Sequence, residues 1–263
     1  EAPAGRVPRR GNEEKILEGL SRAGTRLMGF CVSNLFKRLE SGGPAFIQSL
    51  ERHIVRNFVF IHAIENDLEL PIGTQGAELL DTRISDEDAE GSIFDEEGEG
   101  IRDAAGSAKP PRAEAEFRAQ AAEIYKHYTG PLKSHFKWLR AALFIPDLKA
   151  ALLDDARKLI EVTQRCGEWD PARDAKLDEL AKLLTRKHKD EKVLIFTQFA
   201  DTVRYLAQQL QVRGMDRFAG VTGDSDEPTE LAWRFSPVSN NKREQISPHD
   251  EMRILISTDV LSE

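Results

Sequence analysis

Apolar residues recur every three or four positions over the first part of the chain. Over residues 14–40 this spacing predicts one long helix, and a Ser-Gly-Gly-Pro run at 41–44 predicts its end. Pro44 fits the first position of a second helix, because an N–H at that position has no partner inside the helix. Apolar residues line one face of that helix over 47–64. The pattern therefore predicts an antiparallel helical hairpin.

Further helical patterns follow between residues 112 and 189. One runs over 113–128 and stops at Gly130 and Pro131, and another runs over 146–164 and stops at Gly167. Up to residue 189 the spacing predicts helices only.

The period of the apolar pattern changes after residue 189. Residues 192–199 form a short apolar run that is typical of a strand buried on both faces of a parallel sheet, so residues 193–195 are expected in the sheet core. A helix at 201–212, a strand at 218–223, a helix at 227–235 and a strand at 253–257 follow. This alternation predicts an α/β fold with a parallel sheet and right-handed crossovers, preceded by a helix-rich N-terminal region.

The composition is that of a globular protein. The chain has 263 residues, of which 40% are apolar and 31% charged, and this excludes a disordered or fibrous chain. The formal net charge of −8 arises in one stretch, because residues 81–107 carry ten acidic and two basic side chains and the rest of the chain is balanced. Such a stretch repels itself and buries little apolar surface, so it predicts a flexible acidic linker over 81–111. The alternative is a mobile polyanion mimic that guards a basic surface.

No membrane span, targeting segment or metal site is expected. The longest apolar run, 58–64, is shorter than the roughly 20 residues that cross a bilayer, and the basic N-terminus lacks the apolar core of a signal peptide. Cys31 and Cys166 lie far apart and are expected to be buried, reduced thiols. The six histidines lack metal-ligand spacing. These features predict a cytoplasmic protein without a membrane partner.

Two segments of the expected α/β region are similar to helicase motifs. Residues 192–199 (KVLIFTQF) resemble motif IV of superfamily-two helicases, and residues 254–263 (ILISTDVLSE) resemble motif V. Between them a strand ends in Val-Thr-Gly at 221–223, where that family has a phosphate-contacting turn, and residues 175–184 resemble the helix that precedes motif IV. In this order the segments resemble the Swi/Snf-type helicase-like ATPases, in particular the bacterial ATPases related to the RNA-polymerase-recycling enzyme.

The patterns and the resemblance together predict four regions: a helical hairpin region (1–80), the acidic linker (81–111), a helical region (112–189) and a partial C-terminal RecA-like lobe (190–263). Proteins of this family close two RecA-like lobes on ATP and Mg²⁺ and move along duplex DNA, so the implied function is that of a DNA-translocating, DNA-dependent ATPase. The implied partners are the phosphate backbone of double-stranded DNA, contacted without sequence preference, the first RecA-like lobe of the same protein, and RNA polymerase or another DNA-bound complex.

Three departures from the family pattern limit what this chain does alone. A G-x-x-x-x-G-K-[ST] phosphate loop is absent, the acidic runs at 86–89 and 95–98 do not follow an apolar strand, and the sequence stops inside the motif V-like segment, before the arginine-bearing motif. Because phosphoryl transfer depends on these groups, we expect the chain to be a fragment that does not hydrolyse ATP by itself and contains no catalytic residue.

The resemblance also implies roles for residues at the ends of the strands. Thr258 is placed to contact a DNA phosphate and Asp259 to couple the DNA groove to the nucleotide cleft, although Asp259 is equally suited to cap a following helix. Thr222 and Gly223 offer backbone amides to a phosphate, or form a plain tight turn. Gln198 contacts the tracking strand or orders its own loop. Ligands gather at the carboxyl ends of parallel strands, which favours a site there.

Two other function classes are weaker alternatives. A non-enzymatic adaptor would use the helices of 13–165 as a docking platform beside a degenerate RecA-like lobe. A nucleotide-binding Rossmann-like enzyme is disfavoured, because no glycine-rich turn follows 192–199. The aromatic and basic residues between 125 and 140 suit a DNA contact, but core aromatics flanked by solvated lysines are the commoner arrangement.

Overall fold

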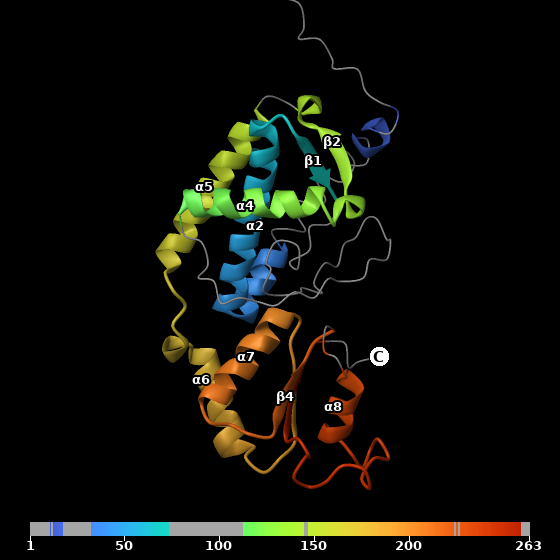
Figure 1. Ribbon diagram of the computed structural model, residues 1–263. Helices are drawn as coiled ribbons and strands as arrows, with labels where there is room; N and C mark the ends of the chain where they lie inside the picture. Colours follow the sequence, from blue (N-terminus) through green and yellow to red (C-terminus); the bar gives the residue numbers. More distant parts are fainter. Residues whose placement is uncertain are drawn as a thin grey trace, which may run out of the picture. The chain divides into compact units, whose positions relative to one another are not determined.

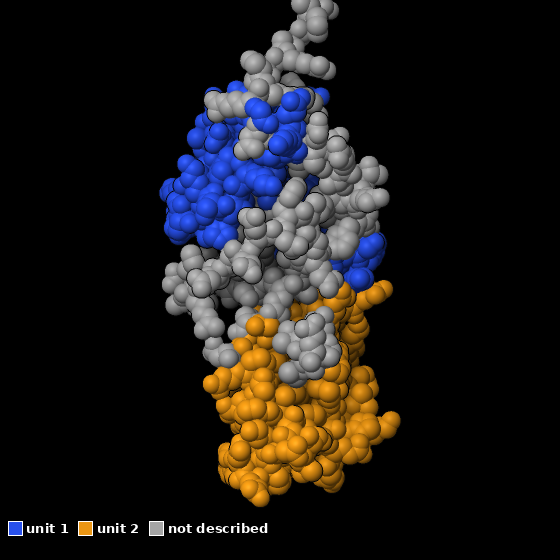
Figure 2. Space-filling model, turned by 90° about the vertical axis from the view of Figure 1, so that its right-hand side faces the viewer, with its two compact units in different colours: residues 1–37, 47–85, 91–167 blue, residues 38–46, 86–90, 168–263 orange. Residues whose placement is uncertain are grey.

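A computed structural model of the chain describes residues 11, 13–17, 33–73, 113–144, 147–223, 225 and 227–258. The whole acidic stretch, Cys31 and Asp259 lie outside the described residues. The chain divides into two compact units, which Figure 2 draws in different colours. Unit 1 comprises residues 1–37, 47–85 and 91–167, and unit 2 comprises residues 38–46, 86–90 and 168–263.

Helix α2 (Gly43–Glu65) confirms the predicted break between two helices. Residues 33–41 are helical, Gly42 interrupts the helix, and α2 starts at the next residue. Most of the residues expected to form the preceding helix lie outside the described ranges, so the predicted hairpin stays a prediction. The apolar face expected over 47–64 is buried at Leu50, Ile54, Phe58 and Ile61.

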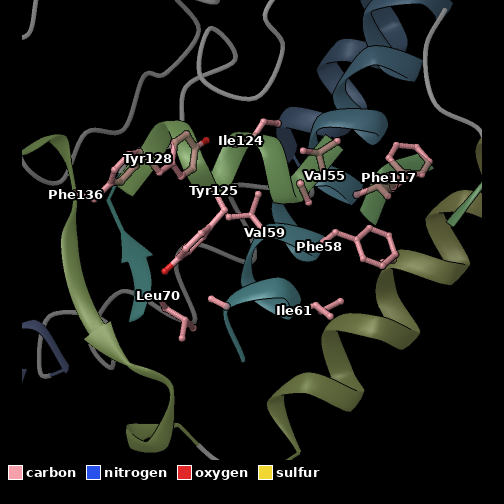
Figure 3. Close-up of a cluster of buried hydrophobic side chains, with 14 of the residues drawn as sticks. Val55, Phe58, Val59, Ile61, Leu70, Phe117, Ile124, Tyr125, Tyr128 and Phe136 are labelled. Carbon is pink, nitrogen blue, oxygen red and sulfur yellow. The ribbon is translucent and has the colours of Figure 1, made fainter. Parts of the chain in front are cut away.

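The core of unit 1 forms where α4 (Glu114–Thr129) and α5 (Leu148–Cys166) pack with α2. Figure 3 shows this cluster of buried side chains, in which the rings of Phe58 and Phe117 stack at 6.3 Å. Both predicted helix stops are confirmed: Gly130 follows α4, and Gly167 follows α5 with a left-handed φ of 68°. Cys166 corrects an expectation, because this thiol is exposed on the last turn of α5 rather than buried.

A two-stranded antiparallel sheet corrects the expectation that only helices precede residue 190. Strand β1 (Glu69–Ile72) pairs with β2 (Lys137–Arg140), and Leu70 lies opposite Leu139. Strands of four residues are too short to show a clear alternation of apolar and polar positions. Their pairing also joins segments that lie far apart in the sequence, and a local sequence pattern cannot predict such a pairing.

The aromatic residues between 125 and 138 belong to the core of unit 1, as the sequence favoured. Tyr125, Tyr128 and Phe136 are buried. The hydroxyl of Tyr125 donates to the carbonyl oxygen of Glu69 at 2.7 Å, which ties α4 to β1. Buried rings offer no face for stacking on a nucleic-acid base.

Unit 2 confirms the predicted alternation of strands and helices. Its elements are α6 (Ala175–Lys182), β3 (Val193–Phe196), α7 (Ala200–Val212), β4 (Phe218–Val221), α8 (Pro228–Phe235) and β5 (Ile254–Ser257). A π-helical turn, η4 (Leu183–Lys187), follows α6. The strands form one parallel sheet in the order β3-β5-β4. The chain is therefore helix-rich with a small parallel sheet, compatible with an α/β fold.

Strand β3 is not buried on both faces as expected. In the described part of the chain it pairs with β5 alone, and its side chains Leu194 and Phe196 are 43% and 57% exposed. Val193 and Ile195 point to the other face, where they pack on a core formed with α6 and α7. The fully buried strand is β5, because it is inserted between β3 and β4. In Figure 1, α6 and α7 lie on one side of β4 and α8 on the other.

Candidate functional site

Three threonines lie in a row at the carboxyl edge of the parallel sheet. Phe196, Ser257 and Val221 are aligned across the three strands. The next residue of each strand is therefore Thr197, Thr258 or Thr222. The backbone ladder continues into this row, since the Thr197 N–H donates to the Ser257 carbonyl (3.0 Å) and the Thr258 N–H donates to the Val221 carbonyl (3.2 Å). We call this row the threonine edge.

Thr258 occupies the centre of the threonine edge. Thr258 is 3% exposed, and its Oγ1 has no hydrogen-bond partner among the described residues. The neighbouring Ser257 hydroxyl donates to the Thr258 carbonyl oxygen at 2.6 Å, so it makes no hydrogen bond with Thr258 Oγ1. A buried hydroxyl without a partner is costly, and a ligand oxygen beside it would remove the cost.

Thr222 and Gly223 open a turn at one end of the edge. The Thr222 N–H donates to the Ser225 hydroxyl and the Ser225 N–H donates to the Thr222 carbonyl, both at 3.0 Å. Ser225 thus engages the Thr222 amide in this structure, and a phosphate contact at Thr222 stays a prediction. Thr222 is buried and Gly223 is exposed, so Gly223 is the residue of this pair that reaches the surface.

Gln198 and Phe199 join β3 to α7 at the other end of the edge. Gln198 is exposed, whereas Phe199 is buried, as expected for a core residue. The guanidinium of Arg38 lies over the Phe199 ring, 4.6 Å from its centroid. The same guanidinium pairs with Asp201 in the first turn of α7, which holds residues 38–46 of unit 2 beside the start of that helix.

A pocket of about 310 Å³ opens beside Thr197. It lies between residues 41–45, α6, the end of β3 and α7, all within unit 2. Its apolar walls are Pro44, Ala45, Leu177, Leu180, Ile195, Phe196 and Leu206, and its polar lining is Ser41, Asp174, Lys176, Thr197, Thr202 and Tyr205. Sequence reasoning missed this pocket, because residues 41–45 and α6 are brought to the sheet by tertiary contacts alone.

Tyr205 is a fixed part of the pocket wall. Its hydroxyl donates to Asp174 Oδ2 at 2.8 Å and accepts from Trp169 Nε1 at 2.9 Å. Burial, with Asp174 beside the ring hydroxyl, raises the pKa of Tyr205 to about 12. The other oxygen of Asp174 accepts the Leu177 N–H at 3.0 Å and so caps α6. Tyr205 thus stays neutral and positions the pocket rather than transferring a proton.

No protein-family model, curated protein or solved structure matches this chain. Within the described residues, no group of three or more histidine, cysteine, aspartate or glutamate side chains is arranged to hold a metal ion. The described helices also include none with the length and apolar character that a membrane span needs. The chemistry of the threonine edge and the pocket is therefore inferred from their own residues.

Proposed function

We propose that unit 2 is part of the second lobe of a Swi/Snf-type, ATP-dependent motor that moves along DNA, and that the threonine edge contacts the phosphate backbone of duplex DNA. The observation that carries this proposal is the buried hydroxyl of Thr258 at the centre of the edge, which has no hydrogen-bond partner among the described residues. Its support from the sequence is that the motif IV-like segment contains β3 and the motif V-like segment contains β5, which are paired neighbours.

The edge suits a phosphate for reasons of hydrogen bonding. Hydroxyls and backbone amides at strand ends donate to phosphate oxygens and carry no information about base sequence. Thr258 would donate to a phosphate oxygen, Gln198 would reach the strand from the exposed end of β3, and Gly223 would let the backbone approach closely because it lacks a side chain. Asp259, which lies outside the described residues, keeps its proposed role in coupling DNA to the nucleotide cleft.

In this proposal ATP and Mg²⁺ are bound by the longer motor protein and not by this chain alone. The chain has no phosphate-loop sequence, and its described residues form no acidic group able to hold a metal ion. We therefore derive no step of ATP hydrolysis from these residues. In the parent protein the first RecA-like lobe would supply the phosphate loop and the metal-binding acids.

DNA binding by this chain tests the proposal. Fluorescence anisotropy with a labelled duplex is expected to show binding that weakens as salt rises and does not depend on base sequence. Thr258→Ala should weaken binding by about tenfold or more, since it removes one hydrogen bond to a charged acceptor. Thr185→Ala is the matched control, because Thr185 is an exposed threonine in η4, away from the strand ends. Absence of salt-sensitive binding would contradict the proposal.

A protein-interaction module is the second candidate function, and two exposed apolar side chains favour it. Leu194 and Phe196 are exposed and point to the same face of strand β3, which lies at the edge of the sheet in the described part of the chain. Isolated exposed apolar side chains are ordinary, but two neighbours on one strand face offer a contact surface. Under this alternative Leu194→Ser with Phe196→Ser would abolish partner capture, and Thr258→Ala would have no effect on it.

A further inference from the structure

The pocket beside Thr197 has walls that suit an apolar group. Leu177, Leu180 and Leu206 face it from α6 and α7, and Ile195 faces it from β3. Its volume of about 310 Å³ falls at the lower end of the range for small-molecule sites, which starts at roughly 300 Å³. The body of a bound molecule must therefore be compact and apolar.

Three hydroxyls on the rim of the pocket contact one another and leave one O–H donor unused. Ser41 Oγ lies 2.7 Å from Thr202 Oγ1 and 3.4 Å from Thr197 Oγ1. Each contact uses one hydroxyl hydrogen, and the three hydroxyls have three. Within the described residues these side chains make no other hydrogen bond, so one O–H remains for a ligand. Thr202 lies in the first turn of α7 and Thr197 shortly before it, where the helix dipole favours negative charge.

Lys176 adds a cation to the same rim. Its ammonium donates to the carbonyl oxygen of Glu40, the residue before Ser41, and Lys176 lines the pocket together with the three hydroxyls. An ammonium has three N–H donors, and two remain after this bond. By contrast, both oxygens of the pocket's Asp174 already accept hydrogen bonds, and the carboxylate of Asp201 is neutralised by Arg38.

We propose that this pocket binds a small organic anion: a carboxylate head held by Lys176 and by the one O–H left among the Ser41, Thr197 and Thr202 hydroxyls, on a compact apolar body packed against the leucines. A carboxylate only accepts hydrogen bonds, and the remaining O–H and N–H groups on this rim are donors that need an acceptor. The proposal does not depend on DNA binding, because the phosphate of a DNA backbone brings no apolar body to fill the walls.

Titration of the isotope-labelled chain with phenylacetate, followed by the amide NMR signals of Thr197, Thr202 and Leu177, tests the proposal. We expect saturable shifts with a dissociation constant on the order of 1 mM, as for a ligand of about ten non-hydrogen atoms. The neutral probe phenylacetamide should bind at least about threefold more weakly, because it lacks the charge that Lys176 attracts. Phenyl phosphate distinguishes a general anion site, if it binds as tightly, from a carboxylate site, if it does not.

Variants separate the proposed site from unspecific effects. Lys176→Met should remove the preference for phenylacetate over phenylacetamide, with an unchanged circular dichroism spectrum. Lys187→Met is the matched control, because Lys187 is an exposed lysine outside the pocket. This variant should leave the dissociation constants of phenylacetate and phenylacetamide unchanged. Equal affinity for both probes, tighter binding of phenyl phosphate, or no saturation by about 10 mM phenylacetate, would overturn the proposal. Thr258→Ala should not alter phenylacetate binding, so failure here is distinguishable from failure of DNA binding.

Discussion

Arg38 Nη1 lies 2.9 Å from Asp201 Oδ2, although the two residues are 163 positions apart in the sequence. Their side chains are 7% and 0% exposed, so the pair is removed from water. Arg204 Nη1 lies 3.7 Å from the second carboxylate oxygen of Asp201. The pair holds residues 38–46 against the start of α7 and thereby forms one side of the pocket.

Removing one partner of this pair should be far more costly than removing both. Asp201→Ala removes the carboxylate that pairs with the buried Arg38 charge, and we expect it to lower the free energy of unfolding by about 3–5 kcal/mol. The double variant Arg38→Met with Asp201→Leu should recover most of that loss, because apolar groups of similar size need no partner. Urea unfolding followed by circular dichroism measures both. Glu179→Ala, which breaks an exposed pair with Lys182, is the control and should change stability little. A small effect of Asp201→Ala would show that water reaches the pair.

Gly43 should tolerate no side chain. A β-carbon there would overlap the ring of Trp169, which lies directly on this backbone. Gly43→Ala is expected to destabilise the protein by about 1–3 kcal/mol through overpacking, measured by thermal or urea unfolding. Gly42→Ala is the neighbouring control, because a β-carbon at Gly42 meets only Pro44 at an ordinary 3.8 Å.

A double-mutant cycle checks the physical reason for the Gly43 effect. Trp169→Ala removes the ring, so Gly43→Ala in that background should cost much less than in the natural sequence. Equal costs in both backgrounds would mean that the strain does not come from Trp169.

Stability should fall as the pH drops below about 6.5, in part because of His53. Burial is the main cause that lowers the pKa of His53, Arg56 adds to it, and Asp155, 3.2 Å from Nε2, opposes it. Because the folded pKa lies below the unfolded one, the unfolded state binds more protons in that interval. The contribution of neutral His53 is therefore complete above the unfolded pKa and decreases until the pH reaches the folded pKa.

The variant His53→Gln tests this assignment by unfolding experiments between about pH 5 and pH 8. It should flatten the decrease in the free energy of unfolding on the acid side. His249→Gln, at an exposed histidine, should keep the pH profile of the natural protein. An unchanged profile in His53→Gln would assign the acid sensitivity to other groups.

If this chain belongs to a longer motor protein, as proposed, Thr258→Ala in that protein tests the motor function. If Thr258 contacts a DNA phosphate, the variant should reduce the stimulation of ATP hydrolysis by duplex DNA by about fivefold or more and leave ATP affinity unchanged. ATP hydrolysis is measured with and without DNA, and nucleotide affinity separately. Equal losses of DNA stimulation and ATP affinity would make Thr258 structural. A parent whose ATP hydrolysis ignores DNA would contradict the proposed motor.

Several parts of the candidate site follow from the sequence. The polar residues after three apolar runs predict a polar edge, and the structure aligns Thr197, Thr258 and Thr222 there. The sequence does not show that Ser225 engages the Thr222 amide, or that Thr258 Oγ1 has no partner within the part of the chain that the structure describes. It also gives no sign of the pocket, whose walls come from segments that are more than 100 positions apart.

The sequence by itself determined the helices, their glycine stops and the alternation of strands and helices in unit 2, because each of these depends on contacts within one element or between neighbours. Only the tertiary structure decided that β5 lies between β3 and β4, that β1 pairs with β2, and that Arg38 meets Asp201. Strand order and buried ion pairs depend on partners that are distant in the chain. An apolar run therefore indicates that β3 is a strand, but not that Leu194 and Phe196 remain exposed at the edge of the sheet.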